Sequence, residues 1–299
     1  MQFDQTDLRL FVAAAELGNL TRAAERQHMS LAAASARIKA LEIECQVPLF
    51  SREARGVKLL PSGEALLHHA RLILAQAEQL RNELREYGGG LRGHLRVFAN
   101  TTAVMDFLPE ILPDFLNRNR QINVDLQEKP NAHIPRGVLD GRADIGIVAG
   151  QVDTLGLDVI HFSTDRLVLV TSRKHPFAKR RRIAFVETLD EDAIAMQQGS
   201  TLQAFLSQVT EGLGKHQRLR VQLGNFDAMC RMIGSGVGIG VVPESAARRN
   251  QEGMQLALIE LTDPWCVRER YLLVRDRRTL PSYAEELVQT LCDYFASRP

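Results

Sequence analysis

The apolar residues at the start of the chain recur with the spacing of short amphipathic helices. One helix is predicted over 7–17, and Gly18 is a natural C-terminal stop for it. A second helix is predicted to begin at Thr21, a plausible N-cap, and to end after about two turns. After a short turn, Ser30 caps a third helix that runs to about Cys45. Two helices joined by so short a turn predict a helix-turn-helix, whose second helix fits the major groove of DNA.

The third helix has a clear inward face. Ala34, Ile38 and Leu41 recur at helical spacing and are predicted to pack on the helix before it. The opposite face then carries Ala32, Ala36, Lys39 and Ile43, with Ser35 and Arg37 towards its flanks. Few of these groups can read a base through paired hydrogen bonds. We expect base selection to depend on methyl contacts with thymine, on Ser35 and Lys39, and on DNA shape.

A basic hairpin is predicted directly after this helix. Residues 49–59 alternate apolar and basic positions around Gly56, which favours two short strands with their tip at or near that glycine. Arg52, Arg55 and Lys58 are placed there for contacts with DNA phosphates. Such contacts give affinity but little sequence information.

One long helix is predicted over 61–87, with Pro61 in its first turn. Its apolar residues repeat at intervals of four and three, as in a coiled coil. They are Leu66, Ala70, Ile73, Ala77, Leu80 and Leu84. Such a seam either buries the helix on its own domain or joins two copies of the chain. We favour the dimer, because a twofold pair would also place two heads on two DNA half-sites.

From residue 91 the pattern changes to alternating strands and helices. This alternation predicts an α/β body with a largely parallel sheet. Strands are expected at 95–99, 122–126, 144–148, 167–170, 194–196, 219–223, 239–243 and 271–274. Helices are expected at 102–117, 136–139, 202–211, 226–233 and 283–295.

Composition adds constraints. The 299 residues, 45% hydrophobic and 24% charged, suffice for a small head and one body of roughly 200 residues. The net charge of +1 is low for a nucleic-acid binder, so binding would depend on local charge. The lack of an export signal or a long apolar run predicts a cytoplasmic protein without a membrane partner. The four scattered cysteines favour buried or idle thiols over a metal or redox role.

The sequence contains no recognisable catalytic motif, whether G-x-S-x-G, H-E-x-x-H or a Walker loop. We therefore expect no enzyme, no catalytic residue, no metal and no cofactor. The glycine-rich run 234–240 lacks the spacing of a dinucleotide fingerprint and precedes a strand, so it is predicted to be a turn after a helix.

The first 64 residues resemble the DNA-binding head of LysR-type transcriptional regulators, and the rest of the chain resembles them more loosely. The matching positions are Leu10-Phe11, Ala14-Ala15-Glu16, Gly18 to Glu25, Ser30, Ser35, Ile38, Leu41-Glu42, Val47 to Phe50, Arg52, Arg55-Gly56-Val57 and Gly63-Glu64. The chain departs from the family at the start of the third helix. The family usually has Gln-Pro after the capping Ser and a later Ser-Arg pair, where this chain has Leu31 to Arg37 without them.

The resemblance implies a winged helix-turn-helix head at 1–60, a linker and dimerisation helix at 61–90, and a two-lobed effector domain at 91–299 that is similar to periplasmic binding proteins. Lobe I is expected at about 91–162 and 267–299, and lobe II at about 163–266. The function implied is a ligand-responsive, sequence-specific regulator that binds double-stranded DNA as a dimer or tetramer, with RNA polymerase as a further partner. The residues expected to contact DNA are Thr21, Arg22, Ser30, Leu31, Ala32, Ser35, Ala36, Arg37, Lys39, Arg52, Arg55 and Lys58.

An effector is expected beyond the carboxyl ends of the strands, where helices begin. The residues at these points are Asn100, Thr101, Thr102, Ala149, Gln198, Ser200, Thr201 and Phe226. Two helix N-termini, one per lobe, favour an anionic group between Thr101/Thr102 and Ser200/Thr201. The alternative is that these hydroxyls only cap their helices. A solute-binding protein and an enzyme on the same body are rival functions, but the first needs an export signal and the second a convergent reactive set.

Overall fold

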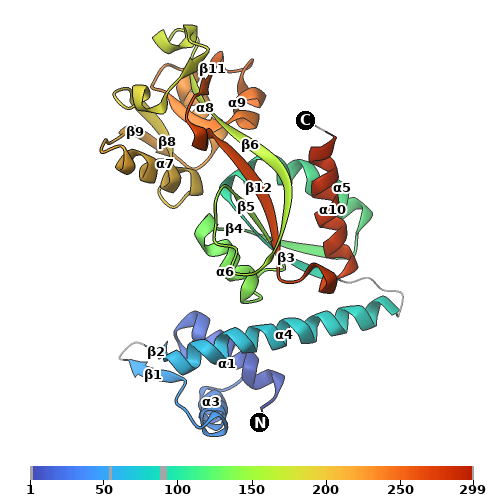
Figure 1. Ribbon diagram of the computed structural model, residues 1–299. Coiled ribbons are helices and arrows are strands. Elements are labelled where there is room, and N and C mark those ends of the chain that lie inside the picture. Colours follow the sequence, from blue (N-terminus) through green and yellow to red (C-terminus); the bar gives the residue numbers. More distant parts are fainter. Residues whose placement is uncertain (1–2, 54–55, 88–92, 298–299) are drawn as a thin grey trace. The chain divides into compact units, whose positions relative to one another are not determined.

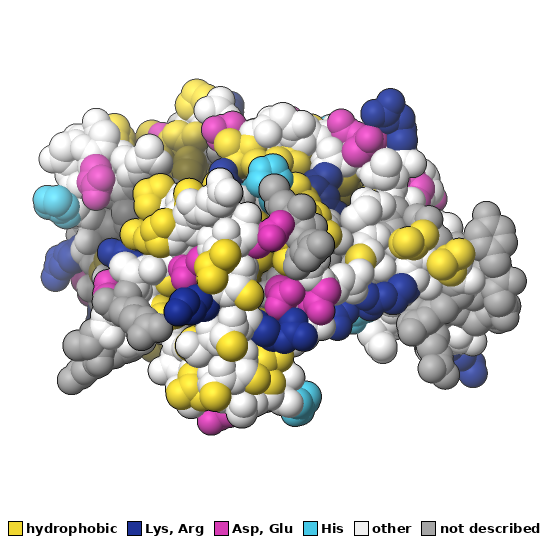
Figure 2. Space-filling view, turned by 90° about the horizontal axis from the view of Figure 1, so that it is seen from below, with side chains coloured by type: hydrophobic (Ala, Val, Ile, Leu, Met, Phe, Trp, Pro, Cys, Tyr) yellow, Lys and Arg dark blue, Asp and Glu magenta, His cyan; other side chains and the backbone are white. Residues whose placement is uncertain are grey.

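The computed structural model describes residues 3–53, 56–87 and 93–297 (Figure 1). They form two compact units, one made mainly by the chain up to residue 92 and the other by the chain from Gly93 onwards. On the face seen in Figure 2, Lys and Arg side chains are interspersed with Asp and Glu side chains, as expected for a net charge of +1. No helix in the described ranges is long and apolar enough to cross a membrane.

The first unit is a helical head with a two-stranded wing and a long helix. Its elements are α1 (Gln5–Leu17), α2 (Leu20–Arg26), α3 (Leu31–Cys45), β1 (Phe50–Glu53), β2 (Gly56–Leu59) and α4 (Pro61–Tyr87). The core is built around Phe11, which is fully buried and whose ring lies 5.2 Å from that of Phe50 on the wing. As predicted, Ala34, Ile38 and Leu41 form the buried face of α3.

Capping residues set where these helices begin. Ser30 caps α3 as predicted, since its Oγ accepts a hydrogen bond from the N–H of Ala33 at 3.2 Å. The prediction that Thr21 caps α2 is wrong: Asn19 is the cap, and its Oδ1 accepts from the N–H of Arg22 at 3.1 Å. The α2 helix thus begins one residue before Thr21, which lies inside its first turn.

The wing forms where it was predicted. The strands β1 and β2 pair antiparallel, and Gly56 is the first residue of β2. Gly56 has φ +134°, and a Cβ there would lie 2.1 Å from the carbonyl oxygen of Gly18, so only glycine fits. The carboxylate of Glu42 on α3 accepts from the N–H of Leu49 at 2.8 Å and so holds the start of the wing.

The second unit contains an eight-stranded sheet that is shared by two lobes. Its strand order is β4-β3-β5-β12-β6-β11-β7, and β10 pairs with β6. In Figure 1 the long strands β6 (Asp158–Ser172) and β12 (Val267–Val274) run side by side from one lobe to the other. The two points at which the chain passes from one lobe to the other were predicted near the starts of these strands.

The first lobe holds the strands β3 (Gly93–Ala99), β4 (Ile122–Glu128) and β5 (Ile145–Ala149) together with β12 and the start of β6. A π-helical turn at Ala103–Phe107, α5 (Leu108–Arg118) and α10 (Ser282–Ala296) pack on one side of this sheet. The α6 helix (Ile134–Leu139) packs with Phe98, Val148 and Leu273 on the other side.

The second lobe holds the end of β6 with β10 (Gly240–Pro243), β11 (Leu256–Leu261) and β7 (Arg182–Ile183), and a separate parallel pair, β8 (Asp192–Met196) and β9 (Arg218–Leu223). Its helices are α7 (Thr201–Gly212), α8 (Phe226–Gly234) and α9 (Glu244–Asn250). As predicted, the run 234–240 is a turn between α8 and β10.

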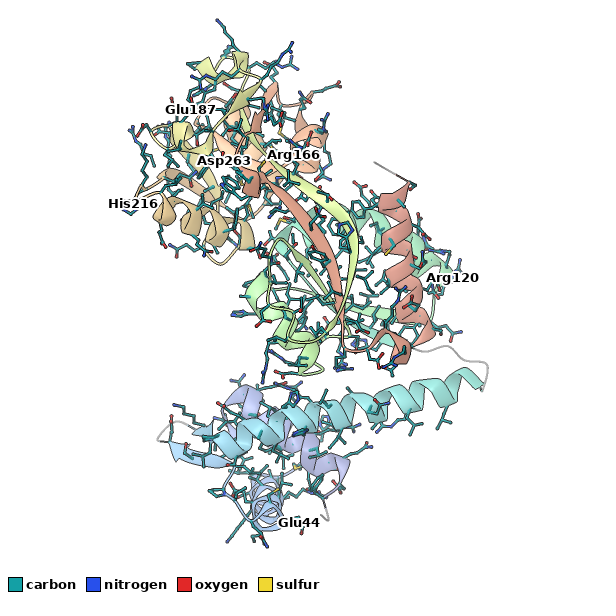
Figure 3. All side chains as sticks on the ribbon, viewed as in Figure 1. Glu44, Arg120, Arg166, Glu187, His216 and Asp263 are labelled. Atoms are coloured by element: carbon teal, nitrogen blue, oxygen red, sulfur yellow. The ribbon has the colours of Figure 1, made fainter. Side chains whose placement is uncertain are left out.

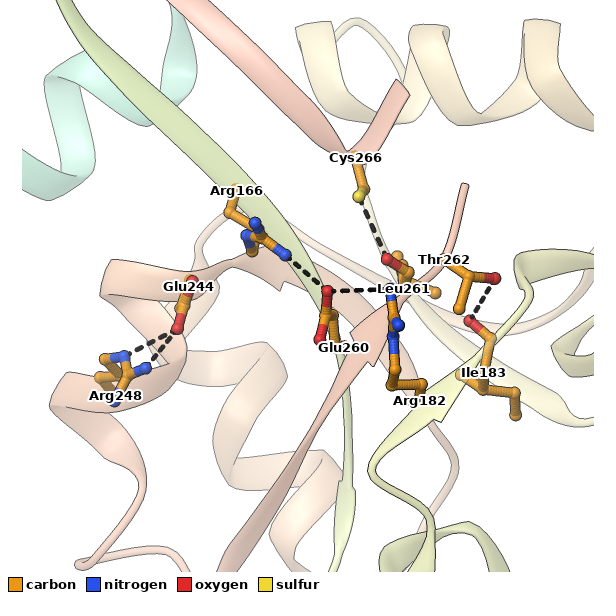
Figure 4. Close-up of polar contacts among 9 residues, drawn as sticks. All are labelled: Arg166, Arg182, Ile183, Glu244, Arg248, Glu260, Leu261, Thr262 and Cys266. Atoms are coloured by element: carbon orange, nitrogen blue, oxygen red, sulfur yellow. Dashed lines mark hydrogen bonds and ion pairs between the residues drawn. The ribbon is translucent and has the colours of Figure 1, made fainter. Parts of the chain in front are cut away.

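Ion pairs and hydrogen bonds fasten the sheet of the second lobe. Glu260 on β11 accepts from Arg166 on β6 at 2.8 Å and from Arg182 on β7 at 3.4 Å (Figure 4). Arg166 and Asp263 lie where the crossing strands enter this lobe (Figure 3), and Asp263 accepts from the N–H of Phe185 at 2.7 Å. These contacts stabilise the two crossing strands at the points where they enter the second lobe.

Two sequence-based expectations for this unit need correction. The predicted strand 167–170 is only part of β6, whose first half is largely exposed and therefore lacks a continuous apolar run. The sheet is not largely parallel. It is parallel where β3 pairs with β4 and β5 and where β11 pairs with β7, whereas β12 pairs antiparallel with both β5 and β6, and β10 and β11 pair antiparallel with β6. The strands β7 and β11 and the helix α9 were not predicted.

Candidate functional site

The outward face of α3 is exposed and mainly apolar. Leu31 is 48% exposed and Ile43 is 68% exposed, and Ala32, Ala36 and Lys39 are also exposed. Ser35 is half-buried at the flank. These residues therefore lie where a groove-binding helix would present them, as the spacing predicted.

Arg37 is the exception among the charged residues of this helix. Its Nη1 donates to Asp7 Oδ1 at 2.6 Å and also reaches Asp4 at 3.4 Å, at the start of α1. The hydrogen bond that Arg37 donates to Asp7 and the charges of both carboxylates raise the pKa of Arg37. The side chain ties α3 to α1, and its contact with DNA stays a prediction.

The other residues expected to contact DNA differ in availability. Thr21, Arg22 and Lys58 are exposed, whereas the hydroxyl of Ser30 is engaged as the cap of α3. Arg55 lies outside the described residues, and so does the side chain of Arg52.

The predicted seam of α4 divides into two parts. Ala70 is fully buried in the core of the head, and Leu66 packs against the same core. This part of the helix is buried on its own domain, so Ala70 is not available to a partner. Further along, Ala77 is half-buried, and Ile73, Leu80 and Leu84 are 45%, 54% and 62% exposed.

A cleft of about 1110 Å³ lies between the two lobes of the second unit. Its apolar wall includes Leu155, Phe205, Val209, Pro264 and Trp265. Trp265 is the only tryptophan in the chain, and its ring lies 5.5 Å from that of Phe205. The cleft can therefore accommodate an apolar group of substantial size.

Polar residues also line this cleft. They are Asn131, Gln151, Asp153, Thr201, Gln208 and Arg268. The N–H of Asn131, in the first lobe, donates to Thr201 Oγ1, in the second, at 3.2 Å. The Nδ2 of Asn131 donates to the carbonyl oxygen of Ala149 at 2.5 Å. The two lobes are thus joined by a direct polar contact at the cleft.

Arg268 belongs to a buried charge cluster. Asp165 accepts from Arg270 at 2.9 Å and from Arg268, and all three side chains are at most 6% exposed. Two guanidinium groups share one carboxylate, so these three side chains together carry one net positive charge, and the more distant carboxylate of Asp106 also acts on Arg270. Burial lowers the pKa of Arg270, which also lies 5.0 Å from the centre of the Phe107 ring. The Nε of Arg268 has no hydrogen-bond partner among the described residues.

Only some of the residues that were expected to bind an effector line this cleft. Ala149 and Thr201 line it, and the others do not. Asn100, Thr101 and Thr102 are buried, and the side chains of the first two are engaged within the lobe. Asn100 Oδ1 accepts from the N–H of Ala103 at 2.9 Å, and Thr101 donates to Glu128 at 2.6 Å.

The remaining positions also need correction. Ser200 is buried and caps α7, since its Oγ accepts from the N–H of Gln203 at 3.1 Å. Phe226 is only 2% exposed in the core of the second lobe, and Gln198 is exposed away from the cleft lining. For Ser200, the alternative that its hydroxyl caps a helix is confirmed.

A second polar contact joins the lobes away from the cleft lining. Asp106, 4% exposed in the first lobe, accepts from Arg249 on α9 at 2.8 Å and from the hydroxyl of Ser245. The bridge holds the lobes in the arrangement that the structure shows, so a change of arrangement would have to break it.

The cysteines offer little reactivity. All four are free, and burial raises the pKa of each thiol, that of Cys230 to about 11. Because the thiolate is the reactive form, these thiols are poor nucleophiles near neutral pH. Among the described residues no group of three His, Cys, Asp or Glu side chains is placed to hold a metal ion.

Two protein-family models match the chain. The bacterial regulatory helix-turn-helix protein model of the lysR family matches residues 5–64, and the LysR substrate binding domain model matches residues 88–296. A probable RuBisCO transcriptional regulator of Trieres chinensis is 28% identical over 271 residues, which is 88% of each chain. The regulator YofA of Bacillus subtilis is 28% identical over 240 residues, which is 80% of this chain and 81% of YofA.

Solved structures share the fold. A full-length variant of OxyR from Pseudomonas aeruginosa has a TM-score of 0.72 at 23% identity, covering 98% of this chain and 94% of that one. Full-length CbnR in complex with its target DNA has a TM-score of 0.62 at 21% identity, covering 97% and 99%. The Synechocystis CcmR regulatory domain in complex with 2-PG has a TM-score of 0.60 at 22% identity, covering 70% and 100%.

Proposed function

The chain belongs to the LysR family of DNA-binding transcriptional regulators, and on this premise we propose that a small organic anion bound between its lobes controls it. The observation that carries the proposal is the buried cluster of Arg268, Arg270 and Asp165, which has one positive charge in excess at the wall of the cleft. A buried unpaired charge is unfavourable, and an anionic ligand would compensate it.

The proposed effector has an apolar body as well as an anionic head. Trp265, Phe205 and Val209 would contact the body, while the guanidinium of Arg268 would receive the head. This replaces the expected cradle of Thr101, Thr102 and Ser200, whose side chains are buried. The complex of the CcmR regulatory domain with 2-PG supports a small-molecule ligand in this type of domain.

The proposed mechanism is a shift between lobe arrangements. Asn131 with Thr201, and Asp106 with Arg249, hold the arrangement seen here. A ligand that binds another arrangement more tightly would increase its population, and the DNA-binding heads would respond. RNA polymerase is proposed as the partner through which the response reaches transcription.

The head is proposed to bind duplex DNA with α3 in the major groove. The exposed cations Arg22, Lys39 and Lys58 would contact phosphates. CbnR, a protein of the same fold, has been solved in complex with its target DNA, and this supports the proposal that the head binds DNA.

A homodimer or homotetramer is proposed, with α4 as one contact. Ile73, Leu80 and Leu84 are exposed along this helix and would pack against a second copy. Ile73→Asp combined with Leu80→Asp should then yield monomers in analytical ultracentrifugation, while Gln76→Asp, at another exposed position of α4, should not. If the double variant keeps the oligomeric state of the parent, the contact lies elsewhere.

The effector proposal can be tested with the fluorescence of Trp265, because the chain has no other tryptophan. Aromatic and aliphatic monocarboxylates are titrated, each paired with its uncharged amide. We expect carboxylates with an apolar body to change the emission and amides to bind at least tenfold more weakly, since a charge-assisted hydrogen bond contributes about 1.5–3 kcal/mol.

A matched pair of variants locates the anionic head. Arg268→Met should weaken the best carboxylate at least tenfold and leave its amide unchanged, whereas Arg248→Met, on the exposed side of α9, should change neither. Equal affinities in the parent and in Arg268→Met would refute the assignment. Failure of every carboxylate to change the emission would refute an anionic effector in this cleft.

A further inference from the structure

The surface of α3 that would face DNA offers methyl groups rather than hydrogen-bonding groups. Within about 50° of the direction opposite the buried face, at roughly 100° per residue, the helix carries four apolar residues and one lysine. They are Ala32, Ala36, Lys39, Ala40 and Ile43, and all are exposed.

Three polar side chains next to this surface are already used within the head, and a fourth, Ser35, is half-buried at its flank. Arg37 donates to Asp7 at 2.6 Å, and Glu42 accepts from the N–H of Leu49 at 2.8 Å. The hydroxyl of Ser30 accepts from the N–H of Ala33. Side chains that read a base through two hydrogen bonds, such as Arg on guanine or Asn and Gln on adenine, are absent from the outward positions of α3.

Thymine is the base that such a surface can distinguish. In the major groove it presents a C5 methyl group, which adenine, guanine and cytosine lack. We infer that α3 selects its DNA site by burying thymine methyl groups against Ala32 and Ala36. The inference rests on the proposed DNA binding and adds the chemistry by which the site is chosen. Lys39 and Lys58, both exposed, supply phosphate contacts that are independent of sequence.

The inference predicts dependence on a single methyl group, which distinguishes it from recognition of DNA shape. Replacing thymine by deoxyuridine removes the C5 methyl and keeps every hydrogen-bonding group of the base. Each buried methyl contributes about fourfold in affinity, so a site with two of them should lose at least tenfold. Replacing the T·A pair by 5-methylcytosine·G restores the methyl and should recover part of that loss.

The experiment uses the full chain and a randomised duplex pool at a fixed low salt concentration. Duplexes selected by the protein are resynthesised with thymine or with deoxyuridine, and both are titrated by fluorescence anisotropy. We expect the thymine form to bind at least tenfold tighter, and the unselected pool to bind equally in both forms. Equal affinity of the two selected forms would overturn the inference even if the selected sites are rich in A·T pairs.

Variants assign the contact to α3. The double variant Ala32→Ser, Ala36→Ser should reduce the ratio of thymine to deoxyuridine affinity to below about threefold. Ala65→Ser, at an exposed position of α4, should leave the ratio unchanged. An unchanged ratio in the double variant would reject these two residues as the contact. If the protein binds no duplex at all, the proposed function itself fails, and this outcome is distinct from equal binding of the two forms.

Discussion

Arginine side chains on α3 and at the cleft between the lobes are used differently. On α3, Arg37 meets two carboxylates, Asp7 and Asp4, so its charge is fully compensated within the head. At the cleft, Arg268 and Arg270 share Asp165, and one positive charge remains in excess. An arginine in a ligand-binding region is therefore a candidate binding group only when the nearby carboxylates do not already match it.

The two regions also differ in exposure, and this sets the energies involved. Arg37 is 40% exposed, so its ion pair is screened by water and stabilises the head only weakly. Arg268 and Asp165 are 6% and 3% exposed, so removing one partner leaves an uncompensated buried charge. The same chemical pair therefore stabilises the head weakly and is essential at the cleft.

The largest expected effect comes from removing the shared carboxylate. Asp165→Asn removes the one carboxylate that pairs with both Arg268 and Arg270 and should lower the free energy of unfolding of the second unit by about 3–5 kcal/mol. Asp7→Asn, in the head, should lower the free energy of unfolding by much less, because Arg37 remains exposed to water and close to Asp4. Urea unfolding followed by Trp265 fluorescence measures the first change, and far-UV circular dichroism measures the second. The exposed Asp190→Asn serves as a control. If Asp165→Asn and Asp7→Asn lower the free energy of unfolding by similar amounts, the two ion pairs do not differ in their contribution to stability.

A smaller effect distinguishes cations that contact DNA from those that hold the head together. Lys58→Gln should reduce the slope of log affinity against log salt concentration by about 1, because one phosphate contact is lost. Arg37→Gln should leave the slope unchanged and slightly destabilise the head, because its guanidinium is engaged by Asp7. Affinities for one duplex at several salt concentrations provide both slopes. A reduced slope in Arg37→Gln would restore that residue as a phosphate contact.

Much of the head follows from its sequence, because local rules determine its elements. The cap at Ser30, the buried stripe through Ala34 and Ile38, and the glycine at position 56 were all recognisable without contacts from elsewhere. The cap of α2 was not, since both Asn19 and Thr21 can cap a helix and spacing alone does not choose between them.

The cleft was harder to predict because its residues are brought together by distant strands. Hydroxyl side chains after a strand suggested an anion site, but the sequence does not tell whether a hydroxyl is already engaged, as in Thr101 and Ser200. One signal was available. Arg268 and Arg270 lie two residues apart and therefore share one face of β12, and Arg268 is the cross-strand partner of Asp165. Charged residues at alternate positions of a strand that enters a core indicate a buried ion pair.

The position of β12 in the sheet has a consequence for biosynthesis. This strand lies between β5 and β6, and it comes from residues 267–274, close to the C-terminus. A nascent chain that has emerged only as far as β11 thus lacks the strand that joins the two halves of its sheet. Folding that proceeds from the N-terminus during translation can complete the head early, but the first lobe must wait until nearly the whole polypeptide has left the ribosome.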